Sequence, residues 1–360
     1  MLPLWVADME IQSPAAVREA LTKRVEHGVF GYGKVEDSYY DAFAWQKKHH
    51  GIDLVKENVR FATGVVGSLY AAIRAYTKEN ASIIICPPVY YPFYDAILNT
   101  GRKLVTCDLD NNKGHYSLNL DKFEKEISDN NAEMFILCSP HNPVCRVWSE
   151  EELNAMLDIC HRHGVLVVSD EIHQDFTYGE IPFISSAIVK GGKYRDMLII
   201  LNSGSKTFNL AGLIHSHVII YDRKLMETYD AYIKSIGSPE VNLLGVTGME
   251  AAFRNGEEWF ENVKSLICHN YNYMKLELAK ELPDVVVTPL EGTYLSWLDL
   301  RNYVPEKETA SFIQNKCRLA CDVGEWFSFT GHGFIRINLA TDTKNIRTAV
   351  ESIVTNIKAL

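Results

Sequence analysis

Apolar strand-like runs that alternate with helical patterns constrain the fold of this sequence more than any other feature. Four such runs are IIIC, FILC, VLVV and MLIIL, all between residues 59 and 202. Strands that are apolar along their whole length are typical of a parallel sheet whose two faces are covered by helices. The sequence therefore predicts an α/β fold with a mostly parallel central sheet.

The pattern changes after about residue 250, where long helical segments lead into short strands such as VVVTPL and GFIRINLA. This change predicts a second, smaller domain of the α+β class. We assign residues 31–250 to a large domain and 251–360 to a small C-terminal domain. We expect residues 1–30 to form an N-terminal segment that packs with the small domain. A chain of 360 residues is long enough for this organisation.

Charge and composition exclude several classes of protein. The net charge of −10 gives no attraction for phosphodiester backbones, so we expect no nucleic-acid partner. No long apolar span or signal segment is visible, and we expect no membrane association. The eight cysteines are scattered, which favours reduced thiols and a cytoplasmic location. The tract CHRH ends a helical pattern, where basic residues suit a helix C-terminus, and we expect no metal site.

Polar residues or glycines directly follow the apolar strands. They are Gly64–Gly67, Tyr90, Asn142, Asp170 and Lys206. Taken alone, Tyr90 could be a core residue, Asn142 a turn former and Asp170 a helix N-cap. Lys206 could be a solvated loop residue. Ligands bind outside the carboxyl ends of the strands in an open parallel sheet, so we expect the five segments to converge on one pocket.

These residues together suggest a phosphorylated pyridine cofactor. The glycine turn before a helix offers backbone N–H groups to a phosphate, and the hydroxyls of Ser203 and Ser205 could add donors. Tyr90 could contact a ring, Asp170 could keep a ring nitrogen protonated, and Lys206 could form a Schiff base. Pyridoxal phosphate has all of these groups. A dinucleotide is the weaker alternative, because TGVVGS lacks the G-x-G-x-x-G spacing.

The sequence also resembles a known family along nearly its whole length. The matching motifs are LPLWVADME, FGYGKVEDSYYDAF, PPVYYPFYDAI, PHNPVCRVWSEEEL, VVSDEIHQDF, SKTFNLAGL, EGTYLSWLDL and GFIRINLA. They resemble the class I/II aminotransferase superfamily of pyridoxal-phosphate enzymes, and most of all its cystathionine β-lyase branch, the C–S lyases of MalY/PatB type. The resemblance implies the fold of the type I pyridoxal-phosphate transferases. Members of the branch begin with a further segment before LPLW, so we expect this chain to be truncated or to lack that arm.

The resemblance implies how the cofactor is held. Lys206 matches the Schiff-base lysine and Asp170 the partner of the pyridinium nitrogen. Asn142 matches the residue that hydrogen-bonds the ring hydroxyl, and Tyr90 matches the stacking aromatic. The backbone of Val65–Val66 matches the phosphate cup, assisted by Ser203 and Ser205.

Other matches concern the substrate and the assembly. Arg336 matches the arginine that grips the substrate α-carboxylate, a task that suits a planar fork. Tyr32 matches a tyrosine that reaches the phosphate of a neighbouring subunit, which implies a homodimer with shared active sites. His173 stands where aminotransferases usually carry a tyrosine, and histidine is typical of the lyase branch. Trp5 is expected to line the substrate side, as is Asn142.

Three departures from the family pattern stand out. Cys145 replaces a glycine, and it is strained if that position requires a positive φ. The stretch GLIHS lacks the arginine that aminotransferases often carry near the phosphate. Gly67 and Ser68 replace a Pro-Gly pair.

The sequence therefore predicts an enzyme that breaks a carbon–sulfur bond. It would convert a small sulfur amino acid, such as cystathionine or a cysteine conjugate, into a thiol, pyruvate and ammonia. The alternative is an aminotransferase that passes the amino group to a 2-keto acid. A third hypothesis is a partner-binding protein with vestigial chemistry, which the intact set of Lys206, Asp170 and Arg336 opposes.

Overall fold

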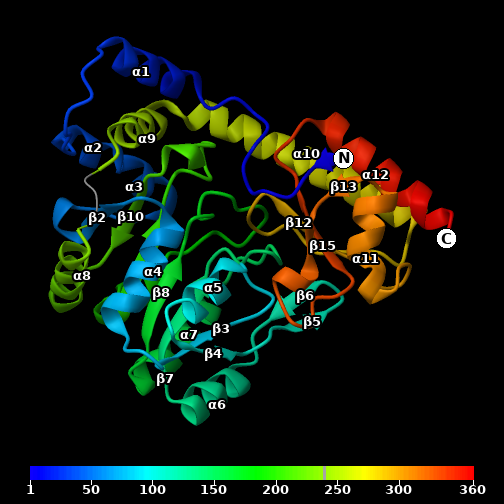
Figure 1. The fold of residues 1–360 in the computed structure, drawn as a ribbon, viewed down its shortest axis with the longest axis horizontal. Coiled ribbons are helices and arrows are strands. Elements are labelled where there is room, and N and C mark those ends of the chain that lie inside the picture. Colours follow the sequence, from blue (N-terminus) through cyan, green and yellow to red (C-terminus); the bar gives the residue numbers. More distant parts are fainter. Residues whose placement is uncertain (238–240) are drawn as a thin grey trace.

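The computed structural model describes residues 1–237 and 241–360. A twisted central sheet forms the middle layer of its larger part (Figure 1). In the described residues this sheet has seven strands, in the order β2 (Val59–Ala62), β10 (Ser216–Ile219), β9 (Leu198–Asn202), β8 (Leu166–Asp170), β7 (Ala132–Cys138), β3 (Ser82–Ile85) and β4 (Lys103–Thr106). Strand β10 is antiparallel to both of its neighbours, and the other pairs are parallel. The predicted α/β fold with a mostly parallel sheet is confirmed.

Helices cover both faces of this sheet. They are α4 (Val65–Tyr76), α5 (Pro92–Leu98) and α8 (Arg223–Ser235) on one face, and α6 (Leu120–Asn130) and α7 (Glu150–His163) on the other. Side chains of a strand point alternately to its two faces. Ile83 and Ile85 accordingly pack with α4 and α5, whereas Ile84 packs in the core that contains α6 and α7. Burial on both faces explains why the strands are apolar throughout.

Helix α7 begins and ends where the sequence indicates. Ser149 Oγ accepts a hydrogen bond from the Glu152 backbone N–H, and the Glu152 carboxylate accepts one from the Ser149 N–H. This reciprocal pair is a capping box. Gly164 follows the helix with φ of 67°, the left-handed conformation that suits glycine at a helix end. The CHRH tract therefore lies in the last turn of a helix.

The C-terminal part is a smaller sheet flanked by long helices. Its four described strands lie in the order β11 (Val286–Val287), β12 (Leu295–Asp299), β15 (Phe334–Asn338) and β14 (Asp322–Val323), and all pairs are antiparallel. Helices α10 (Glu257–Glu281) and α12 (Thr343–Lys358) run side by side at its outer side (Figure 1). This arrangement agrees with the α+β class predicted for this part of the sequence. The exact domain boundaries stay a prediction.

The N-terminal segment joins the two parts. Strand β1 (Leu2–Pro3) pairs with β13 (Leu319–Ala320), beside the small sheet. Asn338 Nδ2 donates to the carbonyl oxygens of Val6 and Asp8 at 2.7 and 2.6 Å. On the other side, the Met9 N–H donates to Asn209 Oδ1 at 3.0 Å, and Asn209 lies three residues after Lys206 in the loop that follows β9. The first residues are thus hydrogen-bonded to the small sheet and to the loop that follows β9.

The remaining elements are short or peripheral. They are α1 (Ala15–Glu26), α2 (Asp37–Ala42), α3 (Ala44–His50), α9 (Leu243–Asn255), α11 (Thr309–Ser311), β5 (Asp110–Asn112), β6 (His115–Ser117), the 3₁₀ turns η1 (Lys56–Asn58), η2 (Val189–Gly191), η3 (Arg195–Met197), η4 (Ala211–Leu213), η5 (Glu306–Glu308) and η7 (Gly324–Trp326), and the π turn η6 (Phe312–Lys316). Helix α1 packs on α9. No helix in the two described ranges is long and apolar enough to cross a bilayer.

Candidate active site

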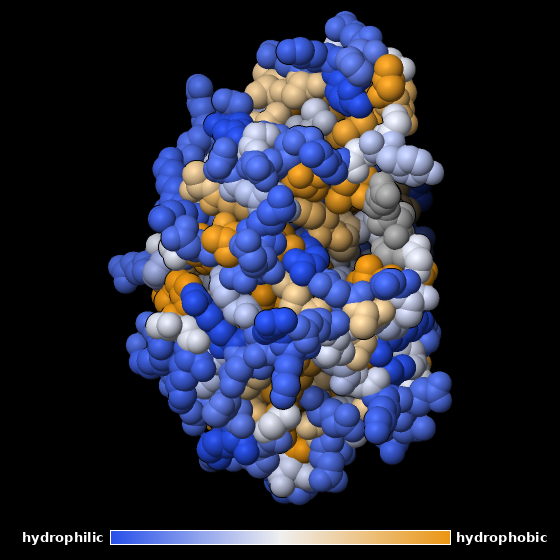
Figure 2. All heavy atoms as spheres, turned by 90° about the vertical axis from the view of Figure 1, so that its left-hand side faces the viewer, coloured by the Kyte–Doolittle hydropathy of each residue, from blue (hydrophilic) through white to orange (hydrophobic). Residues whose placement is uncertain are grey.

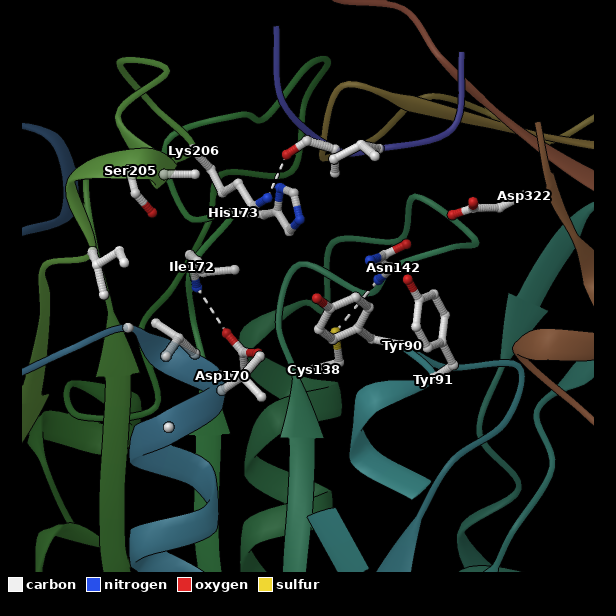
Figure 3. A pocket seen from close by; sticks show the side chains of 18 of the residues that line it. Tyr90, Tyr91, Cys138, Asn142, Asp170, Ile172, His173, Ser205, Lys206 and Asp322 are labelled. Atoms are coloured by element: carbon white, nitrogen blue, oxygen red, sulfur yellow. Dashed lines mark hydrogen bonds between the residues drawn. The ribbon is translucent and has the colours of Figure 1, made fainter. Parts of the chain in front are cut away.

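A pocket of about 430 Å³ lies at the carboxyl ends of the central strands, between the large sheet, the small sheet and the N-terminal segment. Figure 3 shows its side chains pointing toward a common space. Ten of the residues singled out in the sequence line it: Trp5, Val65, Val66, Tyr90, Asn142, Asp170, His173, Ser205, Lys206 and Arg336. The expected convergence of strand ends on one pocket is therefore observed.

Lys206 follows β9, in a turn that leaves its side chain partly buried. Its Nζ donates a hydrogen bond to the carbonyl oxygen of Ala7 in the N-terminal segment. Burial lowers the pKa of Lys206 to about 8, and the positive charge of Arg336 acts in the same direction. A substantial fraction of this amine is neutral near physiological pH, so it can act as a nucleophile or a base. A solvated surface lysine would not behave in this way.

Asp170 is the last residue of β8 and is buried. Its Oδ1 accepts a hydrogen bond from the Ile172 N–H at 3.1 Å. Burial raises the pKa of Asp170 to about 7, although this hydrogen bond and Lys206 both lower it. The carboxylate lacks a close cationic partner among the described residues. A cation bound beside it would keep it ionised.

The glycine turn sits at the start of a helix, as predicted. Gly64 has φ of 113°, a conformation that L side chains rarely adopt, and α4 begins at the next residue. The first backbone N–H groups of this helix carry no intrahelical partner and can receive an anion. The Gly64 N–H itself donates to Ser216 Oγ at 3.1 Å. The N-terminus of α4 can therefore hold a phosphate.

The two serines before Lys206 have different positions. Ser205 lines the pocket. Ser203 does not: it is buried, and its hydroxyl donates to the His215 carbonyl oxygen at 2.7 Å while it accepts from the Ser205 N–H at 3.0 Å. The Ser203 hydroxyl therefore supports the loop instead of facing the pocket. Its expected role beside the phosphate stays a prediction.

Arg336 lies on β15 in the opposite wall and is buried. Its Nη1 donates to Asn142 Oδ1 at 2.9 Å, and its Nη2 donates to the Trp5 carbonyl oxygen at 2.9 Å. Nη2 also pairs with the carboxylate of Asp322. The arginine thus takes part in a salt bridge, but that salt bridge is itself part of the pocket wall.

His173 and Tyr90 are aromatic residues of the pocket. Burial lowers the pKa of His173 well below its usual value, with help from Lys206 and Arg336, so the imidazole is neutral. Its Nδ1 has no hydrogen-bond partner in the described part of the chain. Burial also raises the pKa of the Tyr90 phenol, which is therefore neutral. Both rings can contact an aromatic ligand without adding charge.

A family model for "Aminotransferase class I and II" matches residues 6–353 of this chain. The chain belongs to the aminotransferase class I and II family. It is 35% identical to the cystathionine beta-lyase PatB of Bacillus subtilis, over 98% of this chain and 91% of that protein.

Two solved structures are similar over nearly the whole chain. Cystalysin from Treponema denticola, which contains pyridoxal 5'-phosphate, is 32% identical with a TM-score of 0.96 and covers 100% of this chain and 91% of its own. The C-S lyase from Staphylococcus hominis, bound to the same cofactor, is 32% identical with a TM-score of 0.93 and covers 98% of this chain and 90% of its own. The fold is that of the type I pyridoxal-phosphate transferases.

The departures from the family pattern have clear structural positions. Cys145 has φ of 59°, so the position needs the left-handed conformation and cysteine is strained there. Its Sγ donates to the Leu295 carbonyl oxygen at 3.1 Å, a contact that glycine could not make. Ile214 and His215 line the pocket where the family often carries an arginine. Burial lowers the pKa of His215 to about 4, so it adds no charge to that end.

Tyr32 is the most exposed of the predicted site residues, with 99% of its surface exposed, and it does not line the pocket of its own chain. Conversely, the pocket includes residues that sequence reasoning missed, notably Tyr91, Cys138 and Asp322. Asp322 had a visible signal. It is the carboxylate within the apolar stretch LACDV, where an unpaired charge would be costly.

Proposed function

We propose that this chain is a pyridoxal-phosphate-dependent C–S β-lyase. It would cleave a sulfur amino acid of the cystathionine or cysteine-conjugate type into a thiol, pyruvate and ammonia. The proposal is carried by one observation: Lys206, Asp170 and Arg336 line a single pocket. Two of the similar proteins bear lyase names, cystathionine beta-lyase and C-S lyase, which supports elimination as the outcome.

The residues of the pocket fit pyridoxal phosphate. Burial raises the pKa of the Asp170 carboxyl group, and a protonated pyridine nitrogen beside it would stabilise its ionised form. The backbone of Val65 and Val66 and the Ser205 hydroxyl would hold the phosphate, and Lys206 would bind the aldehyde. Asn142 and Tyr90 would contact the ring. When bound, the cofactor supplies an electron-withdrawing cationic ring next to the α-carbon of the amino acid.

Each chain residue then has a defined task. Arg336 orients the amino acid through its α-carboxylate. Lys206, partly neutral near pH 8, takes the α-proton at Nζ as a general base. Asp170 stays ionised and keeps the neighbouring nitrogen positive. The bond between the β-carbon and sulfur breaks, the thiolate leaves with the bonding electron pair, and the released enamine hydrolyses to pyruvate and ammonia.

Amino transfer to a 2-keto acid is the second candidate, because family membership is shared by both reactions. A coupled assay separates them. Holoenzyme is given cystathionine, and pyruvate and free thiol are measured with and without an added 2-keto acid. We expect equal amounts of thiol and pyruvate without the keto acid. If turnover requires the keto acid and no thiol appears, the protein is an aminotransferase.

The enzyme would act as a homodimer in the cytoplasm. Tyr32 is fully exposed, and the neighbouring Val29 and Phe30 are about 60% exposed. Figure 2 shows apolar side chains among hydrophilic ones on the side of the molecule that is on the left in Figure 1. A second subunit covering this region would bury these side chains and bring Tyr32 to the partner's phosphate. Sedimentation of the holoenzyme tests this, and a fully active monomer would contradict it.

A further inference from the structure

Asp322 is a buried carboxylate in the pocket wall that the proposed reaction does not use. It lies on β14, directly across from Arg336 on β15 in the antiparallel register, and is 2% exposed. Burial raises the pKa of Asp322, and Arg336 lowers it. Arg336 is the one cation that acts on this carboxyl group within the described residues. The two charges therefore compensate one another while the pocket holds no amino acid.

Three of the five N–H groups of Arg336 are already engaged, including the one that faces Asp322. Its two terminal nitrogens already bond Asn142, the Trp5 carbonyl oxygen and Asp322, while its Nε is buried without a partner in the described ranges. A substrate α-carboxylate that binds this guanidinium must share it with Asp322 or displace it. In both cases Asp322 loses part of its compensation in a buried position, which is unfavourable unless a new cation or a proton arrives.

The surroundings of Asp322 lie at the substrate end of the pocket. Figure 3 shows Asp322 beside Tyr91, on the side away from Ser205 and Asp170. The Tyr91 ring contacts Trp326 edge to face, with centroids 5.8 Å apart, and Trp326 is 43% exposed. A carboxylate next to aromatic faces is a favourable environment for an ammonium group. The part of the substrate that leaves with sulfur would have to pass this region.

We propose that Asp322 determines substrate specificity and selects S-substituted cysteines whose leaving thiol carries an ammonium group. The α-carboxylate of such a substrate forms an ion pair with Arg336, and its distal ammonium group forms one with Asp322. Both buried charges therefore remain paired. A neutral substituent leaves Asp322 uncompensated, and an anionic one adds repulsion. This inference rests on the proposed lyase function, since it names the substrate class of the same pocket.

Three substrates that differ mainly in charge test the proposal. They are S-(2-aminoethyl)-L-cysteine, S-(2-hydroxyethyl)-L-cysteine and S-carboxymethyl-L-cysteine, given to holoenzyme at neutral pH with detection of free thiol. We expect kcat/KM for the ammonium substrate to exceed that for the hydroxyl substrate by about tenfold or more. The carboxylate substrate should have the lowest kcat/KM of the three. Equal values for the ammonium and hydroxyl substrates would overturn the proposal.

Asp322→Asn separates specificity from support of Arg336. We expect this variant to lose most of the preference for the ammonium substrate and to lose some activity on all three. Glu325→Gln is the matched control, because Glu325 lies three residues further along the chain, in η7, but pairs with His332 and does not line the pocket. It should keep the wild-type preference. If Asp322→Asn lowers kcat/KM for all three substrates by the same factor, Asp322 only positions Arg336 and the proposal is wrong.

A binding measurement keeps the test independent of the lyase reaction. Each amino acid is titrated into wild-type holoenzyme, and the change in cofactor absorbance gives its affinity. Tighter binding of the ammonium substrate without any thiol release would support the role of Asp322 and refute the lyase function. Thiol release from all substrates at similar rates, with similar affinities, would support the lyase and refute the role of Asp322.

Discussion

The two walls of the pocket are built in different ways. The large-sheet wall presents Asp170 and Lys206 at the ends of parallel strands that are buried on both faces, so their positions are fixed by the backbone. The small-sheet wall presents Arg336 and Asp322, which are held by an ion pair and by hydrogen bonds to the N-terminal segment. The first wall suits a resident cofactor, because fixed groups preorganise charge. The second suits a substrate, because an incoming ligand can replace its polar contacts.

Removal of Lys206 should have the largest effect, since it sits on the fixed wall and no neighbour can replace its amine. We expect Lys206→Ala to lower kcat by about a thousandfold or more, because both covalent attachment and proton transfer are lost. Borohydride reduction followed by peptide mass mapping should find the pyridoxyl group on Lys206 in the wild type only. Lys344→Ala, an exposed helix position, serves as the control. Label on another lysine of the wild type would contradict the assignment.

Asp170→Asn should have the second-largest effect on turnover. The amide keeps the shape of the side chain but cannot neutralise a cationic ring nitrogen, and we expect kcat to fall by roughly 100- to 1000-fold with the cofactor retained. Turnover and the absorbance of the bound cofactor are the two measurements. Asp158→Asn, an ion-paired surface position on α7, is the matched control. Near-native turnover in Asp170→Asn would remove this carboxylate from the mechanism.

On the small-sheet wall, Arg336→Lys should act mainly on binding. A single ammonium cannot reproduce the planar fork, so we expect KM to rise by about 10- to 100-fold with a smaller change in kcat. Steady-state kinetics with an amino-acid substrate give both constants. Arg301→Lys is the control, because Arg301 pairs with Asp299 on the same sheet outside the pocket. A change in kcat alone would mean that the small-sheet wall contributes to chemistry and not to binding.

The pH dependence of cofactor attachment gives the smallest effect, about tenfold per pH unit. Because burial lowers the pKa of Lys206 to about 8, the neutral amine becomes more abundant as pH rises toward 8 and changes little above it. The rate at which apoprotein reacts with pyridoxal phosphate should therefore rise below about pH 8 and then level off. An absorbance time course at several pH values measures this. A rate that keeps rising toward the usual lysine value of 10.5 would show an unperturbed amine.

The large-sheet wall could be predicted from sequence because each of its site residues lies close in sequence to the strand that positions it. Each of Tyr90, Asn142, Asp170 and Lys206 follows an apolar run, and parallel strands bring their carboxyl ends to one edge. That geometry requires no knowledge of distant pairings. The predicted sheet and the capping box of α7 rest on similarly short stretches of chain.

The small-sheet wall was harder to predict, because it depends on register. Asp322 lies on a two-residue strand, and only its pairing with β15 places it across from Arg336. Short strands carry almost no periodicity, so sequence alone gives no register for them. The contacts of Ser203 were hard to predict for a related reason. Its position beside Lys206 can be read from the sequence, but the His215 carbonyl oxygen that accepts a hydrogen bond from its hydroxyl cannot.

The N-terminal segment has a consequence for how the protein is made. Asn338 binds the carbonyl oxygen of Val6 across 332 positions of the chain, and Arg336 reaches Trp5 across 331. The segment leaves the ribosome early, yet its partners on β15 emerge only when synthesis is almost complete. Contacts of such long sequence separation form late and slow the last stage of folding. The substrate wall should therefore close only after the central sheet has formed, so that a nascent chain could acquire its cofactor before it can bind an amino acid.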